Sequence, residues 1–192
     1  MRRAKLLLFS IGLAALLTGC ATSPDLQMSP VAKACQPISV ADCLALLDHE
    51  KLPAKDSIEV LRELATTYLE DMNPERAIEY LDAAIERNDA DAESYQLRGL
   101  AFAVKGLMEQ KSDQKLQQIF AQSSFLLAAT NYLMAIAHDP ENEMNYVTAA
   151  SLFAASGGCK VAKSLGESHE KKFGRTTKQD EIADIIQEKC GG

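Results

Sequence analysis

Five cysteine thiols are the side chains of this 192-residue sequence best suited to chemistry. They could bind a metal, form disulfides or carry a covalent modification, and they stand at Cys20, Cys35, Cys43, Cys159 and Cys190. Zinc sites usually contain closely spaced ligands such as Cys-x2-Cys, and no such pair is present. The three histidines, His49, His138 and His169, lie far apart in the sequence. We therefore predict no metal site.

Recognisable catalytic motifs are absent from the sequence. It contains no Gly-x-Ser-x-Gly, no His-Glu-x-x-His and no Gly-x-x-x-x-Gly-Lys-Ser/Thr. The segment His138-Asp139-Pro140 resembles an acid–base pair, but a cation followed by proline is also typical of a helix C-terminus. The acidic run 88–93 lacks the glycine and the later glutamate of a calcium loop, and helix capping explains it better. We predict that the protein is not an enzyme and needs no cofactor.

The first twenty residues have the pattern of an export signal. A basic start (Arg2, Arg3 and Lys5) precedes the apolar run 6–16, and Leu17-Thr18-Gly19-Cys20 follows. The apolar run is well below the ~20 residues that a membrane-spanning helix needs, which disfavours a permanent transmembrane anchor. The last four residues resemble the bacterial lipobox. That resemblance implies acylation of Cys20 and cleavage before it, and Ala21 at the next position implies sorting to the outer membrane, facing the periplasm.

Removal of residues 1–19 would make the mature chain more acidic than the full sequence. It would take away three basic residues and move the formal net charge from −7 to −10. Such an acidic chain is a poor ligand for nucleic acid, and charge would not hold it on anionic lipid headgroups. Membrane attachment would depend on the N-terminal lipid. Residues 20–33, with two Ser-Pro pairs, are predicted to be a tether between lipid and domain.

Four cysteines remain if Cys20 is acylated, and an exported protein meets an oxidising compartment. Four thiols allow three pairings. We favour Cys35–Cys43 and Cys159–Cys190, because each pair flanks a short segment at one end of the domain.

Apolar spacing predicts helices throughout the remaining chain. After an N-terminal helical segment (34–57), they are expected at about 54–70, 74–87, 92–106, 113–138, 141–155, 159–172 and 178–189. The 34 residues Ile58–Asp91 carry a further pattern, made by Leu61, Leu64, Ala65, Tyr68, Ala77, Leu81 and Ala84. It resembles the tetratricopeptide repeat, in which small residues let two helices approach while large ones fill the groove between them.

Two weaker units follow the first. One carries Tyr95, Gly99, Phe102, Ala128, Tyr132 and Ala135, and the other carries Tyr146, Ala149, Ala150, Phe153 and Ala162. The resemblance implies an all-α fold, a short solenoid of about three αα-hairpins over residues 58–170, with 171–192 as a C-terminal capping helix. Generic packing of αα-hairpins without common descent is the alternative.

The second unit contains about seventeen extra residues, near 107–124. Gly106 falls at the family's turn position, so we expect the first helix to end there and the second to be lengthened, with Ser112 or Asp113 as its cap. In the alternative, both helices extend past Gly106. Leu116, Ile119 and Phe120 would then form a stripe, which either packs on the N-terminal helix around Leu44 and Leu47 or binds a partner.

Repeats of this family bind partners along the concave face, formed by the first helix of each unit. By position, that face comprises Glu59, Arg62, Thr66, Leu69, Glu93, Gln96, Leu100, Ala103, Met144, Val147 and Ser151. The leading hypothesis is an envelope scaffold or adaptor for other envelope proteins, of the pilus, secretion or peptidoglycan-enzyme assembly class. The alternative is a receptor for a hydrophobic small molecule or lipid, suggested by Leu100, Met144 and Val147 at the apolar end of the groove.

Overall fold

The protein is all-helical in the residues that the computed structural model describes, 40–49, 52–112 and 114–191. These ranges hold eight helices and no strand. They are α3 (Val40–His49), α4 (Ala54–Glu70), α5 (Pro74–Arg87), α6 (Ala92–Gln110), α7 (Lys115–His138), α8 (Glu143–Ala155), α9 (Cys159–Phe173) and α10 (Thr177–Cys190). The predicted signal, the predicted lipidation site Cys20, the predicted tether and Cys35 lie outside the described residues.

Short polar side chains begin several of the helices. Asn73 Oδ1 accepts from the backbone N–H of Arg76 at 3.3 Å, and Pro74 occupies the first turn of α5, where a missing N–H costs nothing. Asn142 caps α8 and Thr176 caps α10 in the same manner. These signals are local in sequence, and the predicted bounds of α4 and α5 are accordingly confirmed.

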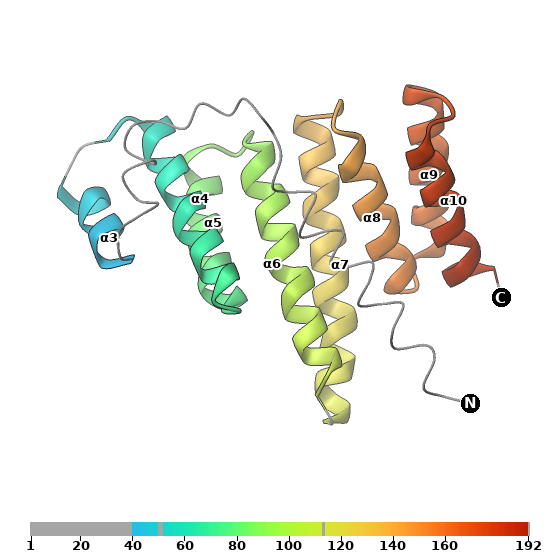
Figure 1. The fold of residues 1–192 in the computed structure, drawn as a ribbon, viewed down its shortest axis with the longest axis horizontal. Coiled ribbons are helices and arrows are strands. Elements are labelled where there is room, and N and C mark those ends of the chain that lie inside the picture. The colour runs from blue at the N-terminus through green and yellow to red at the C-terminus, as the bar shows by residue number, and fades with distance from the viewer. Residues whose placement is uncertain (1–39, 50–51, 113, 192) are drawn as a thin grey trace.

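The helices stand side by side in one row, from α3 at one end to α9 and α10 at the other (Figure 1). Each packs on its neighbours in the chain, and α4 also contacts α6 while α8 contacts α10. The side chains that suggested repeats fill these contacts, because Ala65, Ala77, Ala84, Ala128 and Ala135 are all fully buried. Alanine at such positions permits the close approach of two helix backbones.

The C-terminal end of the row is closed by α10, which packs on α8 and α9 through the fully buried Ile182. The predicted pairing of Cys159 with Cys190 is confirmed, since the two sulfurs lie 2.10 Å apart and join the start of α9 to the end of α10. His169 is also fully buried, with Nδ1 2.8 Å from Gln179 Oε1 and Nε2 3.1 Å from Glu143 Oε1.

At the other end, α3 packs on α4. Cys43 is 3% exposed and lies in a cluster with Val60 and Leu64, against which Leu44 and Leu47 also pack. The structure therefore does not test the Cys35–Cys43 pairing, of which only one member is described.

The helices of the second unit differ from the expectation. Helix α6 does not end at Gly106 but continues to Gln110, and α7 follows after a short turn. The predicted cap is wrong, because Gln114 is the residue that precedes α7, although Ser112 Oγ accepts from its N–H at 3.2 Å. The alternative of a taller hairpin is thus confirmed. In Figure 1 the α6–α7 hairpin reaches well past the ends of the neighbouring helices.

Candidate functional site

Two glycines of α6 fix the orientation of α7 in this hairpin. A Cβ atom at Gly99 would lie 2.8 Å from the ring of Tyr132, and one at Gly106 would lie 2.9 Å from the ring of Phe125. The glycines are seven residues apart, and so are the two aromatic residues. Gly106 is therefore a packing residue inside a helix rather than a turn residue, because the Phe125 ring occupies the space that a side chain would need.

With Phe125 and Tyr132 turned inward, the opposite side of α7 faces outward. Its large apolar side chains are between 38% and 66% exposed, and they are Leu116, Ile119, Phe120, Leu126, Leu127 and Met134. At 100° per residue these six positions fall on one stripe about 120° wide along the whole helix. We call this stripe the α7 face.

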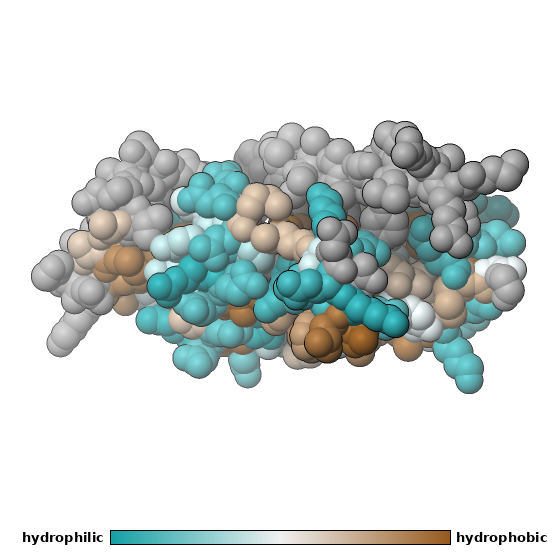
Figure 2. Space-filling view, turned by 90° about the horizontal axis from the view of Figure 1, so that it is seen from below, coloured by the Kyte–Doolittle hydropathy of each residue, from teal (hydrophilic) through white to brown (hydrophobic). Residues whose placement is uncertain are grey.

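The predicted packing of Leu116, Ile119 and Phe120 on the N-terminal helix is wrong. Leu44 and Leu47 are held against α4, at a distance from α7 along the row of helices (Figure 1). Met108, at the end of α6, adds a further apolar side chain that is 44% exposed. Seen from the side of the hairpin tip, an apolar patch stands out among mostly hydrophilic side chains (Figure 2).

The α7 face carries no charge. Between Lys115 and His138 the helix contains no Asp, Glu, Lys or Arg, although these residues make up 24% of the chain. Surface helices of globular proteins normally place charged residues on the solvent side, and a helix that is apolar all round is usually covered on all sides. Helix α7 is covered on one side by α6 and α8, so its outer side has the composition of a contact surface.

Length and composition alone would let α7 cross a membrane, and it is the one helix among the described residues with this property. Neighbouring helices bury 44% of its most apolar window. A core helix of a soluble protein passes the same test of length and composition, so this property is weak evidence for a membrane span.

A groove of about 260 Å³ lies at the C-terminal half of the α7 face. Apolar side chains of α6 and α7 form most of its wall, and its lining consists of Asp82, Arg98, Phe102, Leu127, Thr130, Asn131 and Met134. Arg98 Nη1 lies 2.5 Å from Asp82 Oδ1, its Nε donates to Asn131 Oδ1 at 2.6 Å, and the guanidinium stacks over Tyr95. One arginine thereby ties α5, α6 and α7 together at the edge of the groove.

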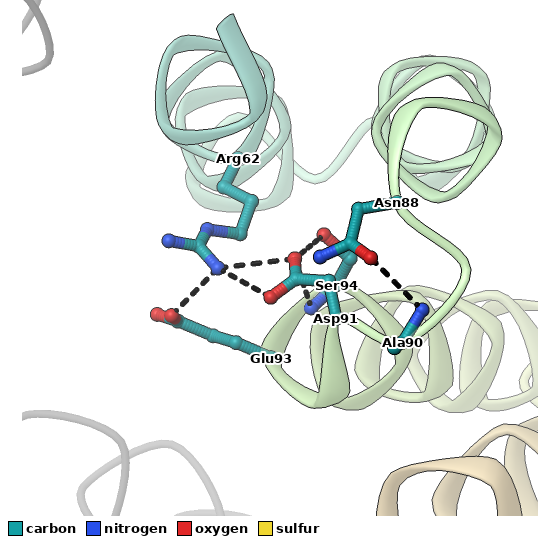
Figure 3. A network of polar contacts seen from close by, with 6 residues as sticks. All are labelled: Arg62, Asn88, Ala90, Asp91, Glu93 and Ser94. Atoms are coloured by element: carbon teal, nitrogen blue, oxygen red, sulfur yellow. Dashed lines mark hydrogen bonds and ion pairs between the residues drawn. The ribbon is translucent and has the colours of Figure 1, made fainter. Parts of the chain in front are cut away.

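Several of the predicted concave-face residues meet at the start of α6. Arg62 of α4 lies 3.0 Å from Asp91 and 2.8 Å from Glu93, and Ser94 donates its hydroxyl to Asp91 (Figure 3). Asp91, which the sequence did not single out as a site residue, caps α6 by accepting from the Ser94 N–H. The cluster joins two successive helix pairs, so Arg62 and Glu93 are engaged within the molecule.

Glu93 has a raised pKa in this cluster. Burial of the carboxyl is the main cause, nearby Arg62 partly offsets it, and the negative charges of Asp91 and Glu59 add to it. Glu59 is itself 8% exposed and lines, with Arg62, an open groove of about 430 Å³ between α4 and the end of α5.

The other predicted face residues are held by intramolecular contacts or packed between helices. Thr66 donates to the Arg62 carbonyl at 2.9 Å, Gln96 donates to Asn145 Oδ1 at 2.9 Å, and Leu69 packs near Ala65. Leu100, Ala103 and Val147 are no more than 9% exposed, while Met144 and Ser151 are half-buried. The apolar end that suggested a small-molecule receptor is therefore largely filled by the protein's own packing.

Two signals for the α7 face were available in the sequence. Leu116, Ile119 and Phe120 were recognised because they belong to an insertion. Leu126, Leu127 and Met134 were missed, although the absence of charge over residues 116–137 pointed to them.

No group of three or more His, Cys, Asp or Glu side chains in the described parts of the chain is arranged to hold a metal ion. Comparison with known proteins finds no matching family model, no matching curated protein and no matching solved structure.

Proposed function

We propose that this protein is a lipid-anchored envelope scaffold of tetratricopeptide type, which binds another protein through the α7 face and catalyses no reaction. The observation that carries the proposal is the α7 face itself, a continuous and uncharged apolar surface on a helix that projects from the fold. Protein interfaces are depleted of charge at their centre and enriched in Phe and Met, as this surface is.

The arrangement of helices supports the repeat assignment within the proposal. Three successive pairs, α4–α5, α6–α7 and α8–α9, pack through the positions that resemble the family, and α10 covers the last pair. Such arrays present long surfaces to partners, which suits an adaptor in pilus, secretion or peptidoglycan-enzyme assembly. The proposed partner surface lies on the second helix of the middle unit rather than on the predicted concave face.

The anchor part of the proposal depends on Cys20, and it can be tested separately. Cys20→Ala should abolish acylation and leave an uncleaved precursor, seen as a larger band without incorporated radioactive palmitate. Membrane-bound protein of the mature size in that variant would overturn the lipid anchor without bearing on the α7 face.

The binding part can be tested by photo-cross-linking in cells. A photoreactive amino acid at Phe120 should give an adduct of higher mass, whereas the same group at the exposed Lys163 of α9 should not. If Phe120 gives no protein adduct, the α7 face is not a protein-binding surface.

A matched pair of variants separates recognition from folding. The change of Ile119 and Phe120 together to Asp should leave the free energy of unfolding of the dilute, unbound chain within about 1 kcal/mol, because both side chains are more than half exposed and a surface substitution usually changes it by no more than about 0.5 kcal/mol. The adduct from a photoreactive group at the neighbouring exposed Ser123 should be lost. Val161→Asp makes the same chemical change at an exposed position of α9 and should keep it. Unfolding of the double variant would show instead that the face is part of the core.

A further inference from the structure

We propose that the protein covering the α7 face is a second copy of this chain, with the two α7 helices packed antiparallel about a twofold axis. This inference rests on the proposed function, since it names the partner of the same surface. Three features of the face point to a self-complementary contact, namely its area, its shape and its charge.

The exposed apolar area is close to what a stable dimer requires. A fully exposed large apolar side chain presents ~200 Å², so the exposed parts of the α7 face and Met108 amount to about 700 Å². A standard interface buries ~800 Å² on each partner, and the small polar residues Ser123 and Thr130 within the face supply further area. The face is therefore large enough without any other part of the molecule.

The two ends of the face have complementary shapes. At the N-terminal end, Leu116 and Phe120 project from the hairpin tip, and at the C-terminal end lies the groove of about 260 Å³ beside Leu127 and Met134. A cavity of ~150 Å³ already binds benzene, so this groove can accept a Phe side chain. In a twofold contact, residue i meets residue j while j meets i, so each tip fills the other copy's groove.

This geometry determines the register of the two helices. An axis near residue 125 places Leu116 opposite Met134 of the second copy, Phe120 opposite Thr130, and Ser123 opposite Leu127. All six positions are exposed on one stripe, so one straight antiparallel contact uses the whole α7 face. The small Ser123 near the axis allows the two helices to approach closely.

Charge favours a second copy over a lipid surface. Two acidic chains can meet along α7 because residues 116–137 carry no charge, and Lys115 at the tip of one copy would lie near the exposed Asp82 at the groove of the other. A helix lying on a bilayer usually has Lys and Arg on its polar side. The side of α7 opposite the face is instead packed on α6 through Phe125 and Tyr132.

Disulfide trapping tests the register in the full chain, in cells. With Leu116 and Met134 both changed to Cys, mild oxidation should give a dimer band on a non-reducing gel. Each single variant should give no more dimer than the parent chain with its native cysteines. In the antiparallel pair, Leu116 of one copy would lie ~27 Å from Leu116 of the other, because the 18 residues between positions 116 and 134 each rise 1.5 Å along the helix. The same distance separates the two copies of Met134. A disulfide spans no more than ~7 Å between Cα atoms. Co-expression of the two single variants should restore the dimer.

Three results would overturn the inference. They are no dimer from the double variant, equal dimer from either single variant, or no dimer from co-expressed single variants. In that case the photoreactive group at Phe120 shows whether the proposed function also fails. An adduct with a different protein would leave the proposed function standing with another partner, whereas an adduct with lipid alone would overturn both proposals.

Discussion

Substitution of Gly106 by Ala tests whether close packing of the α6–α7 hairpin sets the orientation of the α7 face. An alanine Cβ at this position would lie 2.9 Å from Phe125 Cε1 and 3.3 Å from the Ala121 carbonyl oxygen. Phe125 is 5% exposed, so its ring cannot move aside without disturbing the core. We therefore expect Gly106→Ala to destabilise the fold, although alanine is the better helix former.

The expected loss of stability in the Gly106→Ala variant is the sum of two opposing contributions to the free energy of unfolding. Replacing a glycine inside a helix by alanine favours folding by ~1 kcal/mol, whereas overpacking a core costs ~1–3 kcal/mol. The net loss should be about 1 kcal/mol, or a fall in Tm of about 2–4 °C in a protein of this length. Gly166→Ala in α9 is the matched control, because its Cβ would meet the Ile182 Cγ2 methyl group at 3.2 Å. This contact is longer than the one at Gly106, so Gly166→Ala should lose less stability than Gly106→Ala.

Thermal and urea unfolding followed by circular dichroism would measure both changes, and a double-mutant cycle would locate the cause. In a Phe125→Leu background the ring is gone, so Gly106→Ala should lose its penalty and show a coupling of about 1 kcal/mol. A Gly106→Ala variant that loses no more stability than Gly166→Ala would refute the close contact. It would also remove the physical reason for the outward position of the α7 face.

Two further predictions concern Glu93 at the start of α6 and the disulfide at the C-terminal end of the row of helices. Burial raises the pKa of Glu93, so keeping its carboxylate charged in the folded state lowers the free energy of unfolding at neutral pH. This cost disappears as the pH falls below the pKa of the unfolded chain, where the carboxyl is protonated in both states. Glu93→Gln should therefore raise Tm at pH 7–8, and the gain should shrink towards pH 4. A gain that is the same at every pH would contradict this cause. Replacing Cys159 and Cys190 together by Ser opens a loop of 31 residues and should cost ~3 kcal/mol, measured as a lower urea midpoint that reduction of the parent chain reproduces.

The parts of the fold that the sequence predicted correctly are those controlled by local signals. The bounds of α4 and α5 follow from an asparagine cap and a proline. Apart from the C-terminal end of α6, which lies four residues beyond the prediction, the ends of the later helices differ from it by only a residue or two. Gly157 and Gly158 lie in the short connection between α8 and α9, and Gly157 has the positive φ of 85° that favours glycine. Each of these features depends on residues a few positions apart.

Gly106 was misinterpreted because its role depends on a residue nineteen positions away. Within α6 it has the same local environment as a glycine that ends a helix, and only the ring of Phe125 explains why it continues one. The prediction that the concave-face residues form an open binding surface failed for a related reason. Position in a repeat indicates the helix on which Leu100 or Val147 lies, but not that the next helix packs over it.

The orientation of α7 is the step that the hydrophobic pattern could not decide. Its two sides are about equally apolar, so burial of either would remove a similar area from water. Leu127 and Phe120 are seven residues apart, as are Phe125 and Tyr132, and spacing alone therefore fits both sides. Only the inner side offers two rings opposite two glycines with the same spacing, Gly99 and Gly106 on α6. The choice is thus made by shape rather than by hydrophobicity, and it leaves a second apolar surface uncovered. A helix with this composition would be costly to expose permanently, which supports the proposal that a second copy of the chain covers the surface that the glycines turn outward.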